Sequence, residues 1–118
     1  MTPTEIRCRI LSQVTEDITG LWELPAAAGA PGVDELVPVL SDLVREDLIT
    51  IYTGTRFESE ETALPAADAR AAIRDVRFWD WSAPENGPHL RALATPAGRD
   101  WYFGQRDGPS AADRCRSC

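Results

Sequence analysis

The sequence predicts one domain of the α+β class, mainly α-helical with a small antiparallel β-sheet. Two stretches, 6–18 and 36–48, repeat apolar residues every three or four positions, the period of helices that bury one face. A run of β-branched and aromatic residues, LITIYT at 48–53, is typical of a strand. A chain of 118 residues can bury one core but is too short for two ordinary domains.

Three helices are expected in the first part of the chain. Thr2 and Glu5 flank Pro3 in the pattern of a capping box, so the first helix begins there and continues through the apolar stripe to residue 18. A short second helix opens at 21–24, and the glycine-rich turn at 29–32 must end it. The third helix starts near Asp34, a suitable N-cap, and Pro38 must then lie in its first turn.

The rest of the chain alternates between strands, loops and helices. After the strand at 48–53, we expect a polar loop at 54–64, an alanine-rich helix at 65–76, a loop at 82–88 and a second strand at 89–94. Thr95 caps a last short helix with Pro96 at its first position, and this helix stops near Gly104. The polar tail, 105–118, is expected to be disordered.

This order of elements resembles a winged helix-turn-helix domain. Thr95-Pro96-Ala97-Gly98-Arg99 looks like the junction between the second wing strand and the next helix in MarR-like and PadR-like regulators. In physical terms the threonine caps the helix, and the glycine lets a neighbouring backbone approach. The resemblance covers residues 4–54 and 89–104. It implies a single winged-helix domain at 1–104, with residues 54–88 as a long helical insert in the wing.

The charge distribution departs from that of a DNA-binding member of this superfamily. Residues 1–65 hold twelve of the nineteen acidic side chains and only four of the twelve arginines. The third helix, which the resemblance implies to be the recognition helix, carries one arginine, Arg45, and should turn its acids outward: Asp34, Glu35, Asp42, Glu46 and Asp47. Acidic surfaces repel nucleic-acid phosphates. If the protein nevertheless binds DNA, the cations to do so are Arg45 and Arg56.

The aromatic residues after the fourth helix offer a second candidate surface. Phe78, Trp79 and Trp81 follow Arg77, and the simpler interpretation is that these rings cover the core. The alternative is that a tryptophan stays exposed as an anchor for a protein partner. The acids of the preceding loop, Glu58, Glu60 and Glu61, either keep that loop solvated or attract a basic partner.

No pattern in the sequence predicts catalysis or a cofactor. His89, the single histidine, has no nucleophile motif beside it, and no glycine-rich phosphate loop occurs. Cys115 and Cys118 have CxxC spacing, but only Cys8 and His89 could complete a zinc site, so no metal is expected. Three cysteines do not form the framework of a secreted domain, and reduced thiols are expected.

The sequence therefore favours a non-enzymatic winged-helix module that binds another protein, such as an adaptor or an antitoxin or immunity-type protein that neutralises a basic toxin. The alternative is a transcriptional regulator that binds DNA as a homodimer formed through its terminal helices. All twelve lysine or arginine residues of the chain are arginine and alanine is frequent, which is typical of a high-GC bacterial genome. No apolar run spans a membrane and the start lacks the apolar centre of a signal peptide, so a cytoplasmic location is expected.

Overall fold

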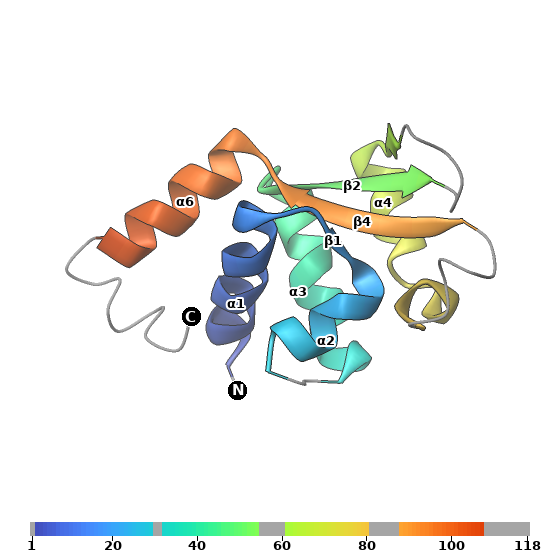
Figure 1. The fold of residues 1–118 in the computed structure, drawn as a ribbon, viewed down its shortest axis with the longest axis horizontal. Helices are drawn as coiled ribbons and strands as arrows, with labels where there is room; N and C mark the ends of the chain where they lie inside the picture. Colours follow the sequence, from blue (N-terminus) through green and yellow to red (C-terminus); the bar gives the residue numbers. More distant parts are fainter. Residues whose placement is uncertain (1, 30–31, 55–60, 81–87, 108–118) are drawn as a thin grey trace.

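The computed structural model describes residues 2–29, 32–54, 61–80 and 88–107. These residues form an α+β fold with a four-stranded antiparallel sheet, as predicted for the fold class. In chain order the elements are α1 (Pro3–Glu16), β1 (Thr19–Gly20), the 3-10 helix η1 (Leu21–Glu23), α2 (Leu24–Ala27), α3 (Val33–Arg45), β2 (Ile49–Gly54), β3 (Thr62–Ala63), α4 (Ala66–Ala72), the 3-10 helix η2 (Val76–Trp79), β4 (His89–Ala94) and α6 (Pro96–Asp107) (Figure 1).

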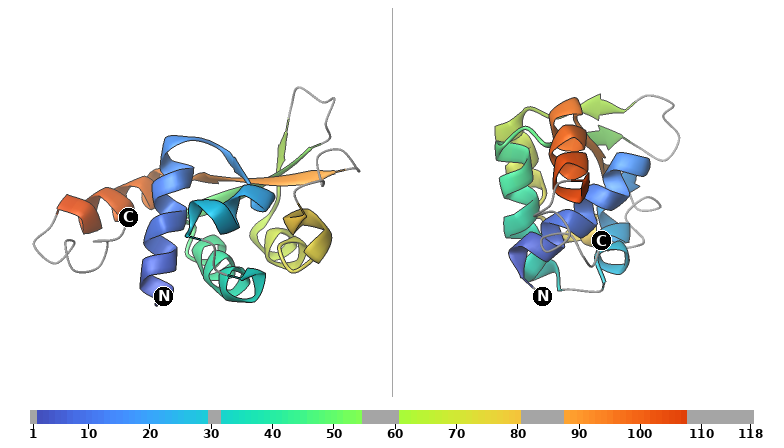
Figure 2. Two further views of the ribbon diagram at one scale, coloured as in Figure 1. Left: turned by 60° about the horizontal axis from the view of Figure 1, so that its bottom comes forward. Right: turned by 90° about the vertical axis from the view of Figure 1, so that its left-hand side faces the viewer.

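The sheet has the strand order β1-β4-β2-β3. The central pair, β2 and β4, is in register from Ile49 opposite Ala94 to Gly54 opposite His89. Helices α1 to α4 lie on one side of these strands, and α6 projects beyond one end of the sheet (Figure 2). The predicted strand at 89–94 is confirmed. The two-residue strands β1 and β3 were not predicted, and β3 lies in a segment expected to be loop, because two residues are too few to show a period.

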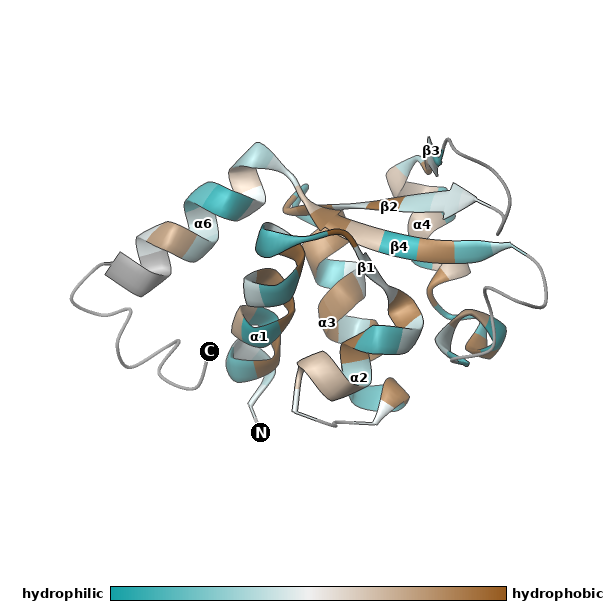
Figure 3. Ribbon diagram, viewed as in Figure 1, coloured by the Kyte–Doolittle hydropathy of each residue, from teal (hydrophilic) through white to brown (hydrophobic). Residues whose placement is uncertain are grey.

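Helix α1 begins where the capping pattern predicts. The Thr2 side chain accepts a hydrogen bond from the Glu5 backbone N–H, at 3.2 Å. Ile6, Ile10 and Val14 of the apolar stripe are buried, and hydrophobic and hydrophilic residues alternate around the helix (Figure 3). Cys8, which lies off the stripe, is also fully buried.

Helix α3 differs from its prediction at the N-terminus. Gly32 is the N-cap and the helix starts at Val33, so Asp34 lies in the first turn and is not the cap. Pro38 is therefore inside the helix, beyond the first turn where it was expected. Proline has no backbone N–H, so Pro38 cannot donate the hydrogen bond that other residues inside a helix donate to the carbonyl four positions earlier. Apolar burial compensates for this lost hydrogen bond, since Leu36, Leu40 and Leu43 on the inner side of the helix are fully buried.

The junction between β4 and α6 forms as the sequence predicts. The Thr95 hydroxyl oxygen accepts a hydrogen bond from the Gly98 N–H at 3.0 Å, and the same hydroxyl donates to the carbonyl oxygen of Asp47 at 2.6 Å. The Thr95 N–H donates to the Leu48 carbonyl at 3.0 Å. The start of α6 is thus fastened to the chain between α3 and β2.

Helices α4 and α6 end elsewhere than predicted. Helix α4 stops at Ala72, and η2 then turns Trp79 into the core, where the indole Nε1–H donates to the Ile73 carbonyl at 2.7 Å. Helix α6 continues through Gly104 to Asp107, so residues 105–107 are helical and do not belong to a disordered tail. Residues 108–118 lie outside the described part of the chain. Across the described residues, no helix is both long and apolar enough to cross a membrane.

Candidate functional site

The outward side of α3 is acidic. At 100° per residue, Asp34, Glu35, Asp42 and the C-cap residue Glu46 fall on one side of the helix, opposite the buried leucines. We call these four residues the acidic face. Asp34, Glu35 and Glu46 are exposed and Asp42 is partly so. The prediction that the acids of this helix point mostly outward is confirmed.

Two arginines neutralise part of this charge. Arg45, the single arginine of α3, pairs with Asp42 at 3.0 Å across one helical turn. Arg7 of α1 forms a two-pronged contact with the Glu46 carboxylate, through Nη2–Oε2 and through Nη1–Oε1 at 3.3 Å. Asp34 and Glu35 form no ion pair with any described residue, so no described arginine offsets the N-terminal half of the acidic face.

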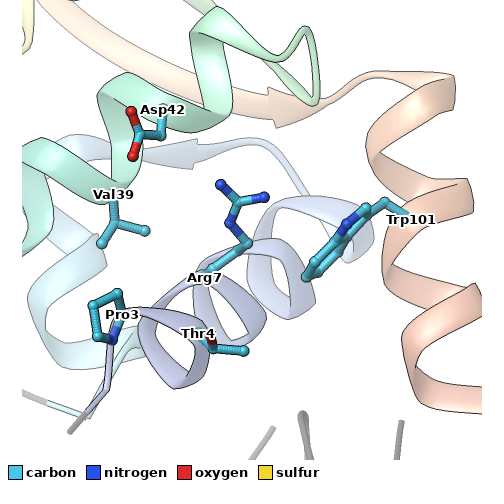
Figure 4. Close-up of a pocket in the computed structure, with 6 residues that line it drawn as sticks. All are labelled: Pro3, Thr4, Arg7, Val39, Asp42 and Trp101. Atoms are coloured by element: carbon cyan, nitrogen blue, oxygen red, sulfur yellow. The ribbon is translucent and has the colours of Figure 1, made fainter. Parts of the chain in front are cut away.

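A groove of about 440 Å³ runs beside the acidic face, between α1, α3 and α6. Arg7 reaches across it, with Asp42 of α3 on one side and Trp101 of α6 on the other (Figure 4). The Arg7 guanidinium carbon lies 5.4 Å from the centre of the Trp101 ring, a cation–π distance. We call this the Trp101 groove; it is lined by Pro3, Thr4, Arg7, Val39, Asp42 and Trp101.

A second groove, of about 360 Å³, separates α3 from α4. We call it the arginine groove; it is lined by Val37, Pro38, Ser41, Asp42, Arg70 and Arg74. Asp42 lines both grooves, so α3 forms a ridge between them. The sequence did not single out Arg7, Trp101, Arg70 or Arg74, because their role depends on helices that meet only in the folded chain.

The predicted aromatic surface is mostly interior where it is described. Trp79 is 7% exposed and hydrogen-bonded through its indole N–H, which is the core position of the simpler interpretation. Arg77 is exposed and its guanidinium is bound to the Asp75 carboxylate at 2.7 Å. Phe78 packs partly buried against the core. Trp81, Arg56, Glu58 and Glu60 lie outside the described residues, and their proposed roles stay predictions.

Glu61 sits beside the sheet and does not belong to a solvated loop. Its carboxylate lies 3.3 Å from the Arg91 guanidinium and 3.8 Å from His89 Nε2. His89 is 4% exposed, and both of its ring nitrogens lack a hydrogen-bond partner in the described part of the chain, as does Glu61 Oε2. The Trp22 ring packs edge-on against the imidazole at 5.8 Å between centroids. Among the described residues, no serine, cysteine or lysine stands beside His89 in this cluster.

Metal-binding side chains do not gather among the described residues. No three of their histidine, cysteine, aspartate or glutamate side chains are grouped to hold a metal ion. Cys115 and Cys118 lie outside the described part of the chain. No protein-family model, curated protein or solved structure matches the chain. The function therefore has to be argued from the surface itself.

Proposed function

We propose that this protein is a small non-enzymatic module of winged-helix type that binds another protein through the acidic face and the adjoining Trp101 groove. The observation that carries the proposal is the charge of α3. Its outward side presents four carboxylates, and its one arginine is already paired with Asp42. A surface of this kind is complementary to a basic partner and accelerates encounter with it.

The winged-helix assignment is supported by the order of elements. Helix, short helix, turn, amphipathic helix and strand are followed, after an insert, by the strand β4 and the capped junction at Thr95. In that arrangement α3 occupies the position of the recognition helix. A recognition helix with an acidic outer side would repel DNA phosphates, whereas it would attract the arginines and lysines of a protein.

Trp101 and Val39 supply the apolar part of the proposed surface, in a groove that Arg7 and Asp42 also line. Tryptophan and arginine are the residue types most enriched where binding energy concentrates, and here Trp101 and Arg7 lie together in an open groove. An apolar side chain of the partner would enter the groove while its basic residues lie along α3. An adaptor, or an antitoxin or immunity-type protein with a basic target, would use such a surface.

A DNA-binding regulator is the second candidate. It is favoured by the same order of elements and by the exposed position of Arg45 on α3. It predicts that duplex DNA binds despite the net charge of −7, and that binding weakens steeply as salt is added. Anisotropy of labelled duplexes at low and near-physiological salt distinguishes the two candidates, since the protein-binding proposal predicts no binding at either salt concentration.

The direct test uses a labelled oligo-arginine peptide as a basic probe. Asp34→Asn with Glu35→Gln removes two charges from the acidic face, whereas Glu16→Gln with Asp68→Asn removes two charges from exposed positions on α1 and α4. We expect the first variant to lose several-fold more affinity than the second. Equal losses would mean that only net charge attracts the probe, and would overturn the assignment of the acidic face.

A further inference from the structure

The arginine groove concentrates positive charge in a protein whose net charge is −7. Arg70 of α4 and Arg74, just beyond the end of that helix, both line it. Neither forms an ion pair with a described residue, whereas Arg7, Arg45, Arg77 and Arg91 all do. Arg9 and Arg99 are also without an ion pair among the described residues, but neither lines the arginine groove. Two unneutralised guanidinium groups on one groove therefore stand out.

The Arg70 guanidinium is held in place by α3. Its Nε–H donates a hydrogen bond to the Ser41 hydroxyl oxygen at 3.0 Å, and Ser41 is only 6% exposed. This bond uses the inner edge of the guanidinium. The two terminal nitrogens make no hydrogen bond with a described residue, so they remain available as a fork of donors, the geometry that binds a carboxylate or phosphate through two parallel bonds.

The remaining groups of the groove do not cancel this charge. Asp42 is the one carboxylate among its lining residues, and it is already paired with Arg45 at 3.0 Å. Val37 and Pro38 form an apolar wall. The groove thus combines a positioned guanidinium, a second exposed guanidinium, a hydroxyl group and an apolar surface.

We infer that the arginine groove is a binding site for a small oxyanion ligand, one that carries a phosphate or carboxylate group. Arg70 grips the oxyanion with its terminal nitrogens, Arg74 adds a second positive charge, and an apolar part of the ligand rests on Val37 and Pro38. This site shares Asp42 with the acidic face, but its binding groups, Arg70 and Arg74, lie on the other side of that residue and do not depend on the proposed protein partner. A ligand bound there would lie next to α3, the helix that carries the acidic face.

The test is a titration followed by NMR, because each arginine Nε–H gives its own signal. Sodium phosphate and sodium acetate are added in separate series to the whole protein, with sodium chloride holding ionic strength constant. We expect saturable shifts of the Arg70 and Arg74 signals and of backbone amides around Ser41. The anion that binds more tightly identifies the acidic group of the ligand. Shifts that are unsaturable, or spread over all arginines, with both anions would overturn the proposal.

Matched variants locate the site. Arg70→Ala and Arg74→Ala should each weaken binding of the preferred anion about tenfold, the loss expected for one charge-assisted contact. Arg99→Ala removes the same charge from an exposed position on α6 and should leave the affinity unchanged. Because Arg74 is exposed, its variant should fold even if Arg70→Ala does not. Equal losses in Arg74→Ala and Arg99→Ala would show that the anion only senses net charge, and would overturn the site.

Discussion

Gly98 and Leu48 approach so closely that no side chain fits between them. A Cβ atom placed on Gly98 would lie 1.9 Å from the carbonyl oxygen of Leu48. That carbonyl is fixed, because it accepts the hydrogen bond from the Thr95 N–H. The obstacle is backbone and cannot rotate away, as the end of a flexible side chain could. The start of α6 therefore depends on glycine at this position.

We expect Gly98→Ala to lower the free energy of unfolding by about 3 kcal/mol, the upper end for overpacking, because the helix must shift to remove the clash. Gly104 is the matched control, since it lies in the same helix and nothing lies within 4 Å of its added Cβ. Gly104→Ala should be neutral or stabilising by up to about 1 kcal/mol. Urea denaturation measures both. Equal effects of the two substitutions would contradict the close approach.

The hydroxyl of Thr95 joins two segments that are distant in sequence. It accepts from Gly98 in the first turn of α6 and donates to Asp47 after α3. Thr95→Val keeps the shape and removes both bonds, so we expect a loss of about 1–2 kcal/mol in urea denaturation. Thr95→Ser retains the hydroxyl and should keep most of the stability. A serine variant as unstable as the valine variant would show that the methyl group, and not the hydroxyl, matters.

Local signals explain which elements the sequence could predict. The cap at Thr2, the β-branched strand β2 and the threonine–proline–glycine junction depend on neighbouring residues, and all three form as expected. The acids of α3 were predicted to face outward because helical periodicity fixes the side that is buried. Strands β1 and β3 could not be predicted, since each exists only through pairing with a central strand.

The grooves were beyond the reach of sequence for a related reason. Arg7 and Trp101 come from opposite ends of the chain and meet because α6 packs against α1. Arg70 meets Ser41 because helix α4 packs against α3. Neither contact leaves a pattern within one element. Trp79 is a different case. The cluster of aromatic residues around it was visible in the sequence, but the sequence could not decide whether the ring faces the core or the solvent.

The hydrogen bond between Trp79 and Ile73 allows the core role of that ring to be tested. Trp79→Phe keeps an aromatic ring but leaves the Ile73 carbonyl without its donor. We therefore expect the free energy of unfolding to fall by about 1–3 kcal/mol. The control is Val76→Ala in the same 3-10 helix, because Val76 is 72% exposed and should matter little. Thermal denaturation followed by circular dichroism compares them. An unchanged midpoint for Trp79→Phe would contradict the core role.

The imidazole of His89 is buried, at 4% exposed, and both of its ring nitrogens lack a hydrogen-bond partner among the described residues. Replacing such a group by an apolar one of similar size removes the penalty of burying unpaired polar atoms, so His89→Leu should leave stability unchanged or raise it by up to about 2 kcal/mol. Leu90→Ala on the same strand, at 1% exposed, should instead destabilise by about 2–5 kcal/mol. Urea denaturation of both variants separates these effects. Destabilisation of His89→Leu comparable to that of Leu90→Ala would indicate that the imidazole makes a favourable interaction.

Asp75 and Arg77 provide a prediction about pH. Two kinds of hydrogen bond hold the pKa of Asp75 below its ordinary value of 3.8. Those donated by the Arg77 side chain contribute most, and the one donated by the Arg77 backbone N–H adds to them. A carboxyl group whose pKa is lowered by folding stabilises the native state above its ordinary pKa, and this contribution disappears as the pH falls through the lower folded value. We expect Arg77→Ala to raise the pKa of Asp75 toward 3.8, as followed by the carboxyl carbon signal in NMR. Any stability difference from the parent protein should be present at neutral pH and vanish in strong acid. Arg74→Ala removes the same charge from a side chain that forms no ion pair with Asp75, so we expect a much smaller change in that pKa. An equal rise in both variants would mean that nearby positive charge, and not the hydrogen bonds, lowers this pKa.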